Sequence, residues 1–279
     1  MYSVREMSKE DIPFAASLAD TMNWNLGAGD FEFMMELEPK GCFTLLYDSE
    51  RVGIVTTVAF GSLGWFSNLI ICEDHRGKGA GASLATHAIK YLKDKGVTTI
   101  GLYAYTERIS FYRKLGFQYD SDFIVLKGKS PVATSDKHVG QAKKADIEKI
   151  LGFDYSCLGV DRKRMLEPIL LDEDNLCYVS AEDRKLNGYI IAKVFNGMAE
   201  IGPLVCESGC GNIAVDLIDT VLSRLENFEV SMCVSNKQAA ILRLLQTRGL
   251  EENFRVARMF HGSTFSRDCI FMAESLERG

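Results

Sequence analysis

Alternating apolar and polar stretches along the chain predict two halves with the same order of elements. Each half is expected to contain a strand hairpin, a third short strand, a helix, a further strand and a final helix. In the first half we expect these at 42–47, 52–60, 67–72, 82–95, 98–103 and in a helix ending at 111–117. In the second half we expect them at 176–180, 186–195, 204–207, 212–226, 229–234 and in a helix ending at 244–250. The order of elements supports an internal repeat more strongly than the residue identities do.

This order of elements also predicts the fold class. Helices placed between strands, after antiparallel hairpins, indicate an α/β fold with a mixed antiparallel and parallel sheet flanked by helices in each half. The stretch at 130–138 is short, polar and poor in large apolar residues. We therefore predict two tandem domains, 1–129 and 139–279, joined by a linker at 130–138.

The composition is that of an ordinary globular protein and excludes several classes. The 279 residues are 47% hydrophobic and carry a net charge of −6, which disfavours nucleic acid or an anionic membrane as partner. No run of about 18 apolar residues and no apolar leader occurs, so we expect no membrane span and a cytoplasmic location. The eight cysteines and four histidines show no metal-ligand spacing, and we expect no metal.

A glycine-rich loop before the predicted helix carries the clearest chemical signal. Its sequence is Arg76-Gly77-Lys78-Gly79-Ala80-Gly81. The start of a helix exposes unpaired N–H groups and partial positive charge, and glycine lets the backbone approach an anion closely. The loop therefore predicts a phosphate cradle.

Three other interpretations of the loop are weaker. A P-loop requires Gly-Lys followed by Ser or Thr, and this is absent. A dinucleotide loop fits the spacing of Gly77, Gly79 and Ala82, but it expects an acidic residue about 20 positions later at the end of the next strand. That strand, 98–103, is followed by Ala104. A plain glycine turn with solvated charges stays open.

The loop and its surroundings resemble the GNAT superfamily of N-acetyltransferases. Arg76, Gly79 and Gly81 match its pyrophosphate signature, R-x-x-G-x-G. The segment 111–117 resembles its second signature, a helix ending in tyrosine, basic residues and Gly-Phe. Upstream, 68–73 resembles the strand whose backbone pairs with pantetheine. The resemblance covers 2–127.

The resemblance implies binding of acetyl-CoA in a V-shaped gap between the strands at 69–72 and 98–103. The implied cofactor-binding residues are Leu69, Ile71, Arg76, Gly77, Lys78, Gly79, Ala80 and Gly81. An N–H donor near Leu69 would polarise the acetyl carbonyl, and the Tyr112 hydroxyl would protonate the leaving thiolate. Tyr112 can also be explained as a packed aromatic residue. Trp24 and Asn25 lie where the superfamily places its acceptor side, although Trp24 is as readily a core residue.

The acceptor and the general base stay open at this stage. Glu73, Asp74, Asp30 and Glu32 are candidate bases, but each is more commonly a surface carboxylate. The resemblance implies a small-molecule or peptide amine as acceptor, without saying which. The protein is expected to be a monomer or a weak dimer.

The second half has lost the signature. At the matching place, 207–213 contains no Arg or Lys and lacks the R-x-x-G-x-G spacing, and Leu245 stands where the first half has Tyr112. The chain therefore resembles tandem GNAT proteins in which the amino-terminal copy alone carries the cofactor motif. We expect an N-acetyltransferase; the alternative is an acyl-CoA-binding sensor or interaction module without turnover.

Overall fold

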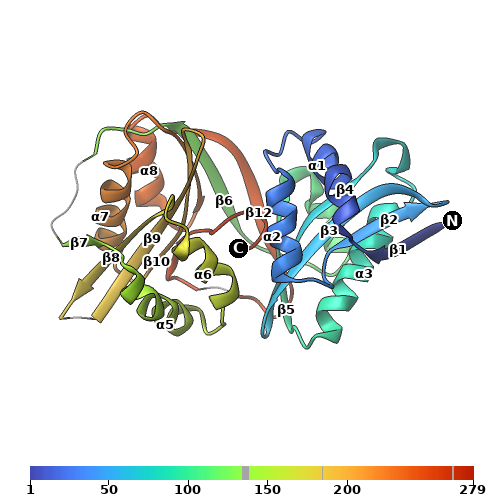
Figure 1. Cartoon of the computed structure of the whole chain (residues 1–279), viewed down its shortest axis with the longest axis horizontal. Coiled ribbons are helices and arrows are strands. Elements are labelled where there is room, and N and C mark those ends of the chain that lie inside the picture. Colours follow the sequence, from blue (N-terminus) through green and yellow to red (C-terminus); the bar gives the residue numbers. More distant parts are fainter. Residues whose placement is uncertain (134–137, 184, 266) are drawn as a thin grey trace.

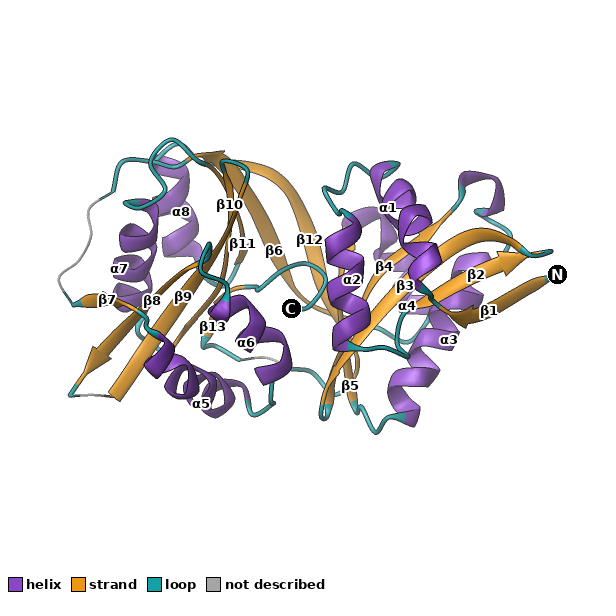
Figure 2. Ribbon diagram, viewed as in Figure 1, coloured by secondary structure: helices purple, strands orange, loops and turns teal. Residues whose placement is uncertain are grey.

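The computed structural model describes residues 1–133, 138–183, 185–265 and 267–279. Within these residues, the strands form one 13-stranded mixed sheet that runs through both halves of the chain. Its strand order is β1-β2-β3-β4-β5-β12-β6-β11-β13-β10-β9-β8-β7. Figure 2 shows this sheet in orange with purple helices packed against it in each half. The predicted mixed sheet flanked by helices is confirmed.

The first half contains a strand meander followed by alternating helices and strands. Its strands are β1 (Tyr2–Glu6), β2 (Phe43–Tyr47), β3 (Glu50–Phe60), β4 (Leu63–Ile71), β5 (Thr99–Tyr105) and β6 (Gln118–Lys129). Its helices are α1 (Ile12–Asp20), α2 (Ala28–Leu37), α3 (Ala80–Asp94) and α4 (Ile109–Lys114). The helix predicted from 82 begins two residues earlier, because Gly79 takes a left-handed φ of 83° and the helix starts directly after it.

The second half repeats this order and adds a short final strand. Its strands are β7 (Val139–Gln141), β8 (Leu176–Glu182), β9 (Lys185–Phe195), β10 (Met198–Cys206), β11 (Glu229–Ser235), β12 (Glu251–Gly262) and β13 (Ile270–Met272). Its helices are α5 (Ile147–Leu158), α6 (Lys163–Leu171), α7 (Gly211–Leu222) and α8 (Ala239–Thr247). The third strand predicted in each half is the end of a longer strand, β4 or β10.

Each half gives its last long strand to the other half. Strand β12 pairs with β5 from Val256 opposite Tyr105 to Gly262 opposite Thr99. Strand β6 pairs with β11 over an equally long stretch, and β6 and β12 pair with each other in the middle. In Figure 1 these two strands, green and red, run side by side between the halves. The sequence analysis did not predict this exchange.

Helices from both halves also share one hydrophobic core. This core includes Phe31 of α2 and Leu166 of α6, both almost fully buried. At its edge, the guanidinium of Arg164 on α6 donates to the carbonyl oxygens of Leu37 and Ala59, at 3.0 and 3.2 Å. The shared core and the exchanged strands hold the halves together as one unit.

The predicted domain boundaries stay a prediction. Residues 134–137 of the predicted linker lie outside the described residues, as does Arg184 in the second predicted hairpin. At the start of the linker, the Ser130 N–H donates to the Phe228 carbonyl oxygen at 2.8 Å. The backbone has thus already joined the second half at Ser130.

Candidate active site

The cavity that contains the predicted site begins where β4 and β5 separate. These parallel strands are paired from Leu63 opposite Thr99 to Trp65 opposite Gly101. Beyond Trp65 they are no longer partners, while β5 continues to pair with β12 as far as Tyr105. The space between them belongs to a cavity of about 1590 Å³.

A β-bulge marks the point where β4 bends away from β5. The register between β3 and β4 shifts after the Thr56–Ser67 pair, so Asn68 and Leu69 have no partners of their own in β3. Asn68 takes a left-handed φ of 53°, and its side-chain amide donates to the Thr56 hydroxyl at 3.0 Å. Because a bulge redirects a strand and its neighbouring groups, it turns Leu69 toward the cavity, where Leu69 is a lining residue.

The glycine-rich loop closes one end of this gap and starts α3. Gly77 and Gly79 take left-handed φ values of 73° and 83°, and a Cβ at either position would meet no atom within 4 Å. Nε of Arg76 donates to the Ile71 carbonyl oxygen at 2.8 Å, which folds its side chain against the end of β4. The loop therefore presents open backbone at the start of a 15-residue helix.

The structure brings most of the predicted site residues to one cavity. Lining residues include Leu69, Ile71, Arg76, Gly77, Gly79, Gly81, Tyr112, Trp24 and Asn25. Lys78 and Ala80 are not lining residues: the Lys78 side chain is exposed, and Ala80 is buried in the core beside α3. Of the four candidate bases, Asp30 lines the cavity, and its carboxylate accepts the Gly27 N–H at 2.8 Å.

Tyr112 projects from α4 into the same cavity. Its ring packs edge-on against Phe66, Phe111 and Phe117, with ring centroids 5.0 to 6.1 Å away. Within the described residues its hydroxyl has no hydrogen-bond partner. Burial raises the pKa of the Tyr112 phenol well above its usual value, and the nearby positive charge of Arg108 offsets this in part. Tyr112 is therefore protonated at neutral pH.

Trp24 lies across the cavity, between α1 and α2. Its indole N–H donates to the hydroxyl of Tyr105 at 2.9 Å, and the two rings are 6.4 Å apart. Tyr105 in turn lies 5.6 Å from the ring of Phe254, which comes from the second half. Trp24, Tyr105 and Phe254 therefore form an aromatic group at the end of β5, with residues from both halves.

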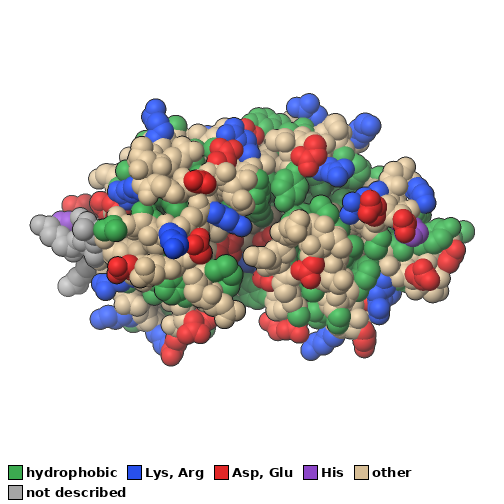
Figure 3. Space-filling view, turned by 90° about the horizontal axis from the view of Figure 1, so that it is seen from above, with side chains coloured by type: hydrophobic (Ala, Val, Ile, Leu, Met, Phe, Trp, Pro, Cys, Tyr) green, Lys and Arg blue, Asp and Glu red, His purple; other side chains and the backbone are tan. Residues whose placement is uncertain are grey.

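Sequence reasoning missed the part of the cavity that the exchanged and second-half strands build. The lining residues of this part include Val125 and Lys127 of β6, Ser231 and Cys233 of β11, and Phe254 and Val256 of β12. Within each pair the residues are two apart, so they share one face of the sheet. Figure 3 shows the hollow between the halves. The alternation is visible in the sequence, but it does not reveal which strands become neighbours.

The corresponding gap in the second half is filled by the chain itself. Strands β10 and β11 are parallel partners from Met198 opposite Glu229 to Ile201 opposite Met232. Beyond this point β13 lies between them and pairs with both. Phe271 and Met272 of β13 are buried in the core of the second half.

Two features are absent from the described residues. No helix within them is long and apolar enough to cross a membrane. Nor do they contain a group of three or more histidine, cysteine or acidic side chains that could hold a metal ion.

Two family models match the chain, one in each half. The acetyltransferase (GNAT) family matches residues 3–117, and an acetyltransferase (GNAT) domain matches residues 150–269. The chain belongs to the GNAT acyltransferase family, with two GNAT units in tandem. It is accordingly an acyltransferase, and the resemblance to the GNAT superfamily drawn from the two signatures is confirmed.

Individual proteins are similar over almost the whole chain. Holothin acyltransferase from Pseudoalteromonas sp. (strain SANK 73390) is 22% identical over 265 residues, covering 94% of this chain and 88% of that protein. A candidate acetyltransferase structure from Pyrococcus horikoshii is 21% identical with a TM-score of 0.81, covering 100% of this chain and 96% of its own. A tandem GNAT protein from the clavulanic acid biosynthesis pathway is 12% identical with a TM-score of 0.63, covering 95% and 100%. The structural likenesses establish the shared fold.

Proposed function

We propose that this GNAT protein transfers an acetyl group from acetyl-CoA to a primary amine, by direct attack while both substrates are bound. One observation carries this proposal: the open gap between β4 and β5 has the glycine-rich start of α3 at one end and the Tyr112 hydroxyl in the same cavity. Ligand pockets commonly measure about 300 to 1,000 Å³. A cavity of about 1590 Å³ therefore has room for two substrates.

The loop residues fit the diphosphate of acetyl-CoA. The open space beside Gly77 and Gly79 lets a phosphate approach the N–H groups at the start of α3, where the helix dipole favours negative charge. Arg108 and Lys114 also line the cavity and add positive charge. The backbone of Arg76–Gly81 would hold the diphosphate, and Ile71 at the end of β4 would pair with the pantetheine arm.

Two groups of the chain would act on the thioester that acetyl-CoA supplies. The backbone N–H of Leu69, redirected by the bulge, would donate a hydrogen bond to the acetyl oxygen as negative charge develops there. The Tyr112 phenol would donate its proton to the departing sulfur. The phenol holds that proton at neutral pH, so it is available when the sulfur departs. The proton released by the attacking amine would then restore the phenol. Trp24 and Asn25 would contact the acceptor amine, because they line the cavity from the α1–α2 segment.

Calorimetry and a transfer assay test this proposal together. Isothermal titration with acetyl-CoA should give one site per chain, and a panel of primary amines should release CoA with at least one member. Two sites would contradict the assignment of the second half. Binding of acetyl-CoA without CoA release for any amine would contradict transfer and favour the sensor.

A further inference from the structure

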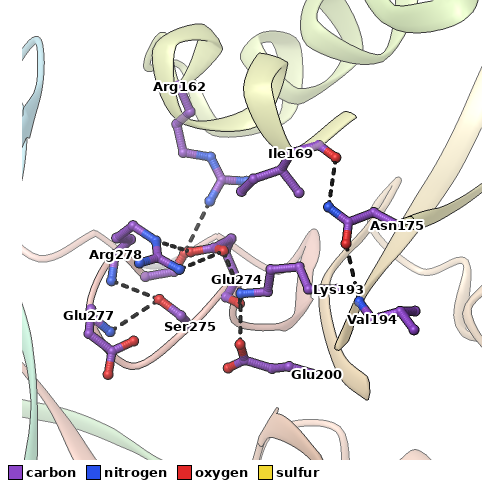
Figure 4. Close-up of polar contacts among 11 residues, drawn as sticks. Arg162, Ile169, Asn175, Lys193, Val194, Glu200, Glu274, Ser275, Glu277 and Arg278 are labelled. Carbon is purple, nitrogen blue, oxygen red and sulfur yellow. Dashed lines mark hydrogen bonds and ion pairs between the residues drawn. The ribbon is translucent and has the colours of Figure 1, made fainter. Parts of the chain in front are cut away.

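The second half ends in a network of charged side chains beside the cavity, of which Glu274 and Arg278 are buried and Glu200 is half-buried. Nζ of Lys193 lies 2.7 Å from Glu274 and 2.8 Å from Glu200, and Nε of Arg278 lies 2.8 Å from Glu274. Figure 4 shows these contacts on one side of the segment that ends the chain. The two positive and two negative side chains balance each other.

Glu277 adds one negative charge that this network does not balance. It lines the cavity, and within the described residues no basic side chain lies within ion-pair distance of its carboxylate. Figure 4 shows the carboxylate turned away from the Arg278–Glu274 pair. Burial raises the pKa of Glu277, and Glu200 raises it further, although Arg278 and Lys193 partly offset this. Such a carboxylate is stabilised by a cation that enters the cavity.

The aromatic group packs against the residue next to Glu277, because Leu276 lies in the same hydrophobic cluster as Tyr105 and Phe254. Burial raises the pKa of Tyr105, and the negative charges of Glu107 and Glu277 add to the rise. Tyr105 connects through its hydroxyl to Trp24 and through its ring to Phe254. A ligand that reaches Glu277 therefore passes aromatic surface on its way from the β4–β5 gap.

The width of the sheet separates this region from the reacting groups. Strands β5, β12, β6 and β11 lie in order between β4 and β10, which carries Glu200. At about 4.8 Å per strand the two ends of the cavity are roughly 20 to 25 Å apart. Glu277 lines the same cavity, and its neighbour Leu276 packs in the cluster that contains Tyr105 at the end of β5. It therefore meets a part of the acceptor other than the attacking amine.

We propose that Glu277, together with Tyr105 and Phe254, binds a second, positively charged group of the acceptor. The acceptor class is then a diamine-like molecule: one primary amine is acylated in the β4–β5 gap, while an apolar or aromatic body carries an ammonium group to Glu277. This inference rests on the proposed acetyl transfer. It gives the second half its own task, recognition of the acceptor.

Two matched probes test the subsite. 4-(Aminomethyl)benzylamine and 4-methylbenzylamine share a primary amine and an aromatic body, and the distal ammonium is present in the first alone. Binding is followed through tryptophan fluorescence, which requires no transfer, and kcat/KM is followed through CoA release. We expect the unchanged protein to prefer the diamine by about tenfold or more, and Glu277→Gln to bring the two probes within about twofold.

Glu251→Gln is the control variant. Glu251 is exposed and is not a lining residue, and the substitution makes the same change in net charge. It should keep the diamine preference. An unchanged acetyl-CoA affinity of the Glu277→Gln protein shows that it is folded.

The outcomes separate this inference from the proposed function. Equal binding of both probes to the unchanged protein overturns the subsite, as does a diamine preference that survives Glu277→Gln. Loss of the preference with Glu251→Gln as well attributes it to net charge and also overturns the subsite. A protein that binds the diamine selectively but releases no CoA would instead contradict acetyl transfer and leave the subsite supported.

Discussion

The two halves of this protein open the same gap in a sheet and use it in opposite ways. In the first half β4 and β5 separate after Trp65, and the space becomes a cavity. In the second half β10 and β11 separate after Ile201, and β13 enters the space and pairs with both edges. Both strand pairs diverge, but a cavity forms at the β4–β5 gap alone of these two, because no other strand enters that gap.

The loops before the corresponding helices α3 and α7 share a backbone geometry and differ in charge. Gly79 precedes α3, and Gly209 lies before α7 with a nearly identical φ of 84° and equally open surroundings. The second loop, however, carries Glu207, which pairs with Lys185 at 2.6 Å. A carboxylate at this place opposes a bound phosphate. The second loop thus keeps the left-handed glycine before its helix but lacks the positive charge that a phosphate requires.

The largest effect is expected when each of these two glycines is replaced by tryptophan. Gly79→Trp would place an indole in the space beside the start of α3, and we expect acetyl-CoA affinity to fall at least about 1,000-fold, or about 4 kcal/mol. Gly209→Trp is the matched control, because backbone strain at a positive φ is the same. Titration calorimetry on both variants checks this. Equal losses would show that the diphosphate does not bind at α3.

The next prediction concerns the strand that fills the second gap. Met272→Ala removes a fully buried side chain of β13, and we expect it to lower the free energy of unfolding by about 3 kcal/mol. Leu69→Ala at the open gap removes a half-buried side chain that faces the cavity, so its cost should be under about 1 kcal/mol. Urea unfolding followed by circular dichroism measures both. Similar costs would contradict the distinction between a filled and an open gap.

Tyr112→Phe tests whether the first half carries the proton donor of the chemical step. Loss of the proton donor should lower kcat by about 100-fold, or about 2.7 kcal/mol, with little change in acetyl-CoA affinity. Tyr155→Phe makes the same chemical change at an exposed position of α5 and should leave the rate unaltered. Initial rates of CoA release measure the effect of both variants. An unaltered rate for the first variant would remove Tyr112 from the mechanism.

The smallest expected effect compares two equivalent aspartates at the start of each half. Asp11 is fully buried, and its carboxylate accepts hydrogen bonds from Arg5 and Arg51 at 2.6 Å. Asp146, its counterpart, is paired with an exposed lysine. Asp11→Asn should cost about 1.5 kcal/mol, since both arginines can still reach water, and Asp146→Asn under about 0.5 kcal/mol.

The pH dependence of stability follows from the same contacts. Burial alone would raise the pKa of Asp11, but hydrogen bonds from Arg5, the Ser8 N–H and Arg51 outweigh it and hold the pKa well below its usual value. A lowered pKa gives stability that is present above the unfolded-state pKa of about 3.9 and is lost as the pH falls further. The difference between the unchanged protein and Asp11→Asn should therefore shrink below about pH 4. Urea midpoints between pH 3 and 7 test this.

The glycine-rich loop and the helix end at 111–117 could be located from the sequence, because each of them is local. Residues 76–81 lie between one strand and one helix, and the signature at 111–117 is a single helix end, so glycine and spacing reveal both. Lys78 and Ala80 are predicted to bind the cofactor, and their side chains do not line the cavity, because a motif does not show which side chains point away from a ligand. In the proposed complex the loop contributes its backbone, so its side chains are free to differ.

The part of the cavity built by β6, β11 and β12 could not be predicted in the same way. Strand β12 is apolar at Val256 and Phe260, but nothing in these residues indicates insertion between β5 and β6. The three residues of β13 are too few to show a period. Glu277 belongs to the cavity because distant segments meet there, so neither its charge nor its neighbours in sequence mark it.

The exchange of β6 and β12 has a consequence for any attempt to take the protein apart. A piece that ends at Lys129 lacks the strand that covers β5, and a piece that begins at Val139 lacks the strand that covers β11. Each alone would expose an unpaired edge. Co-expressed as separate polypeptides, the pieces should find each other and restore the enzyme, as the fragments of a split reporter do.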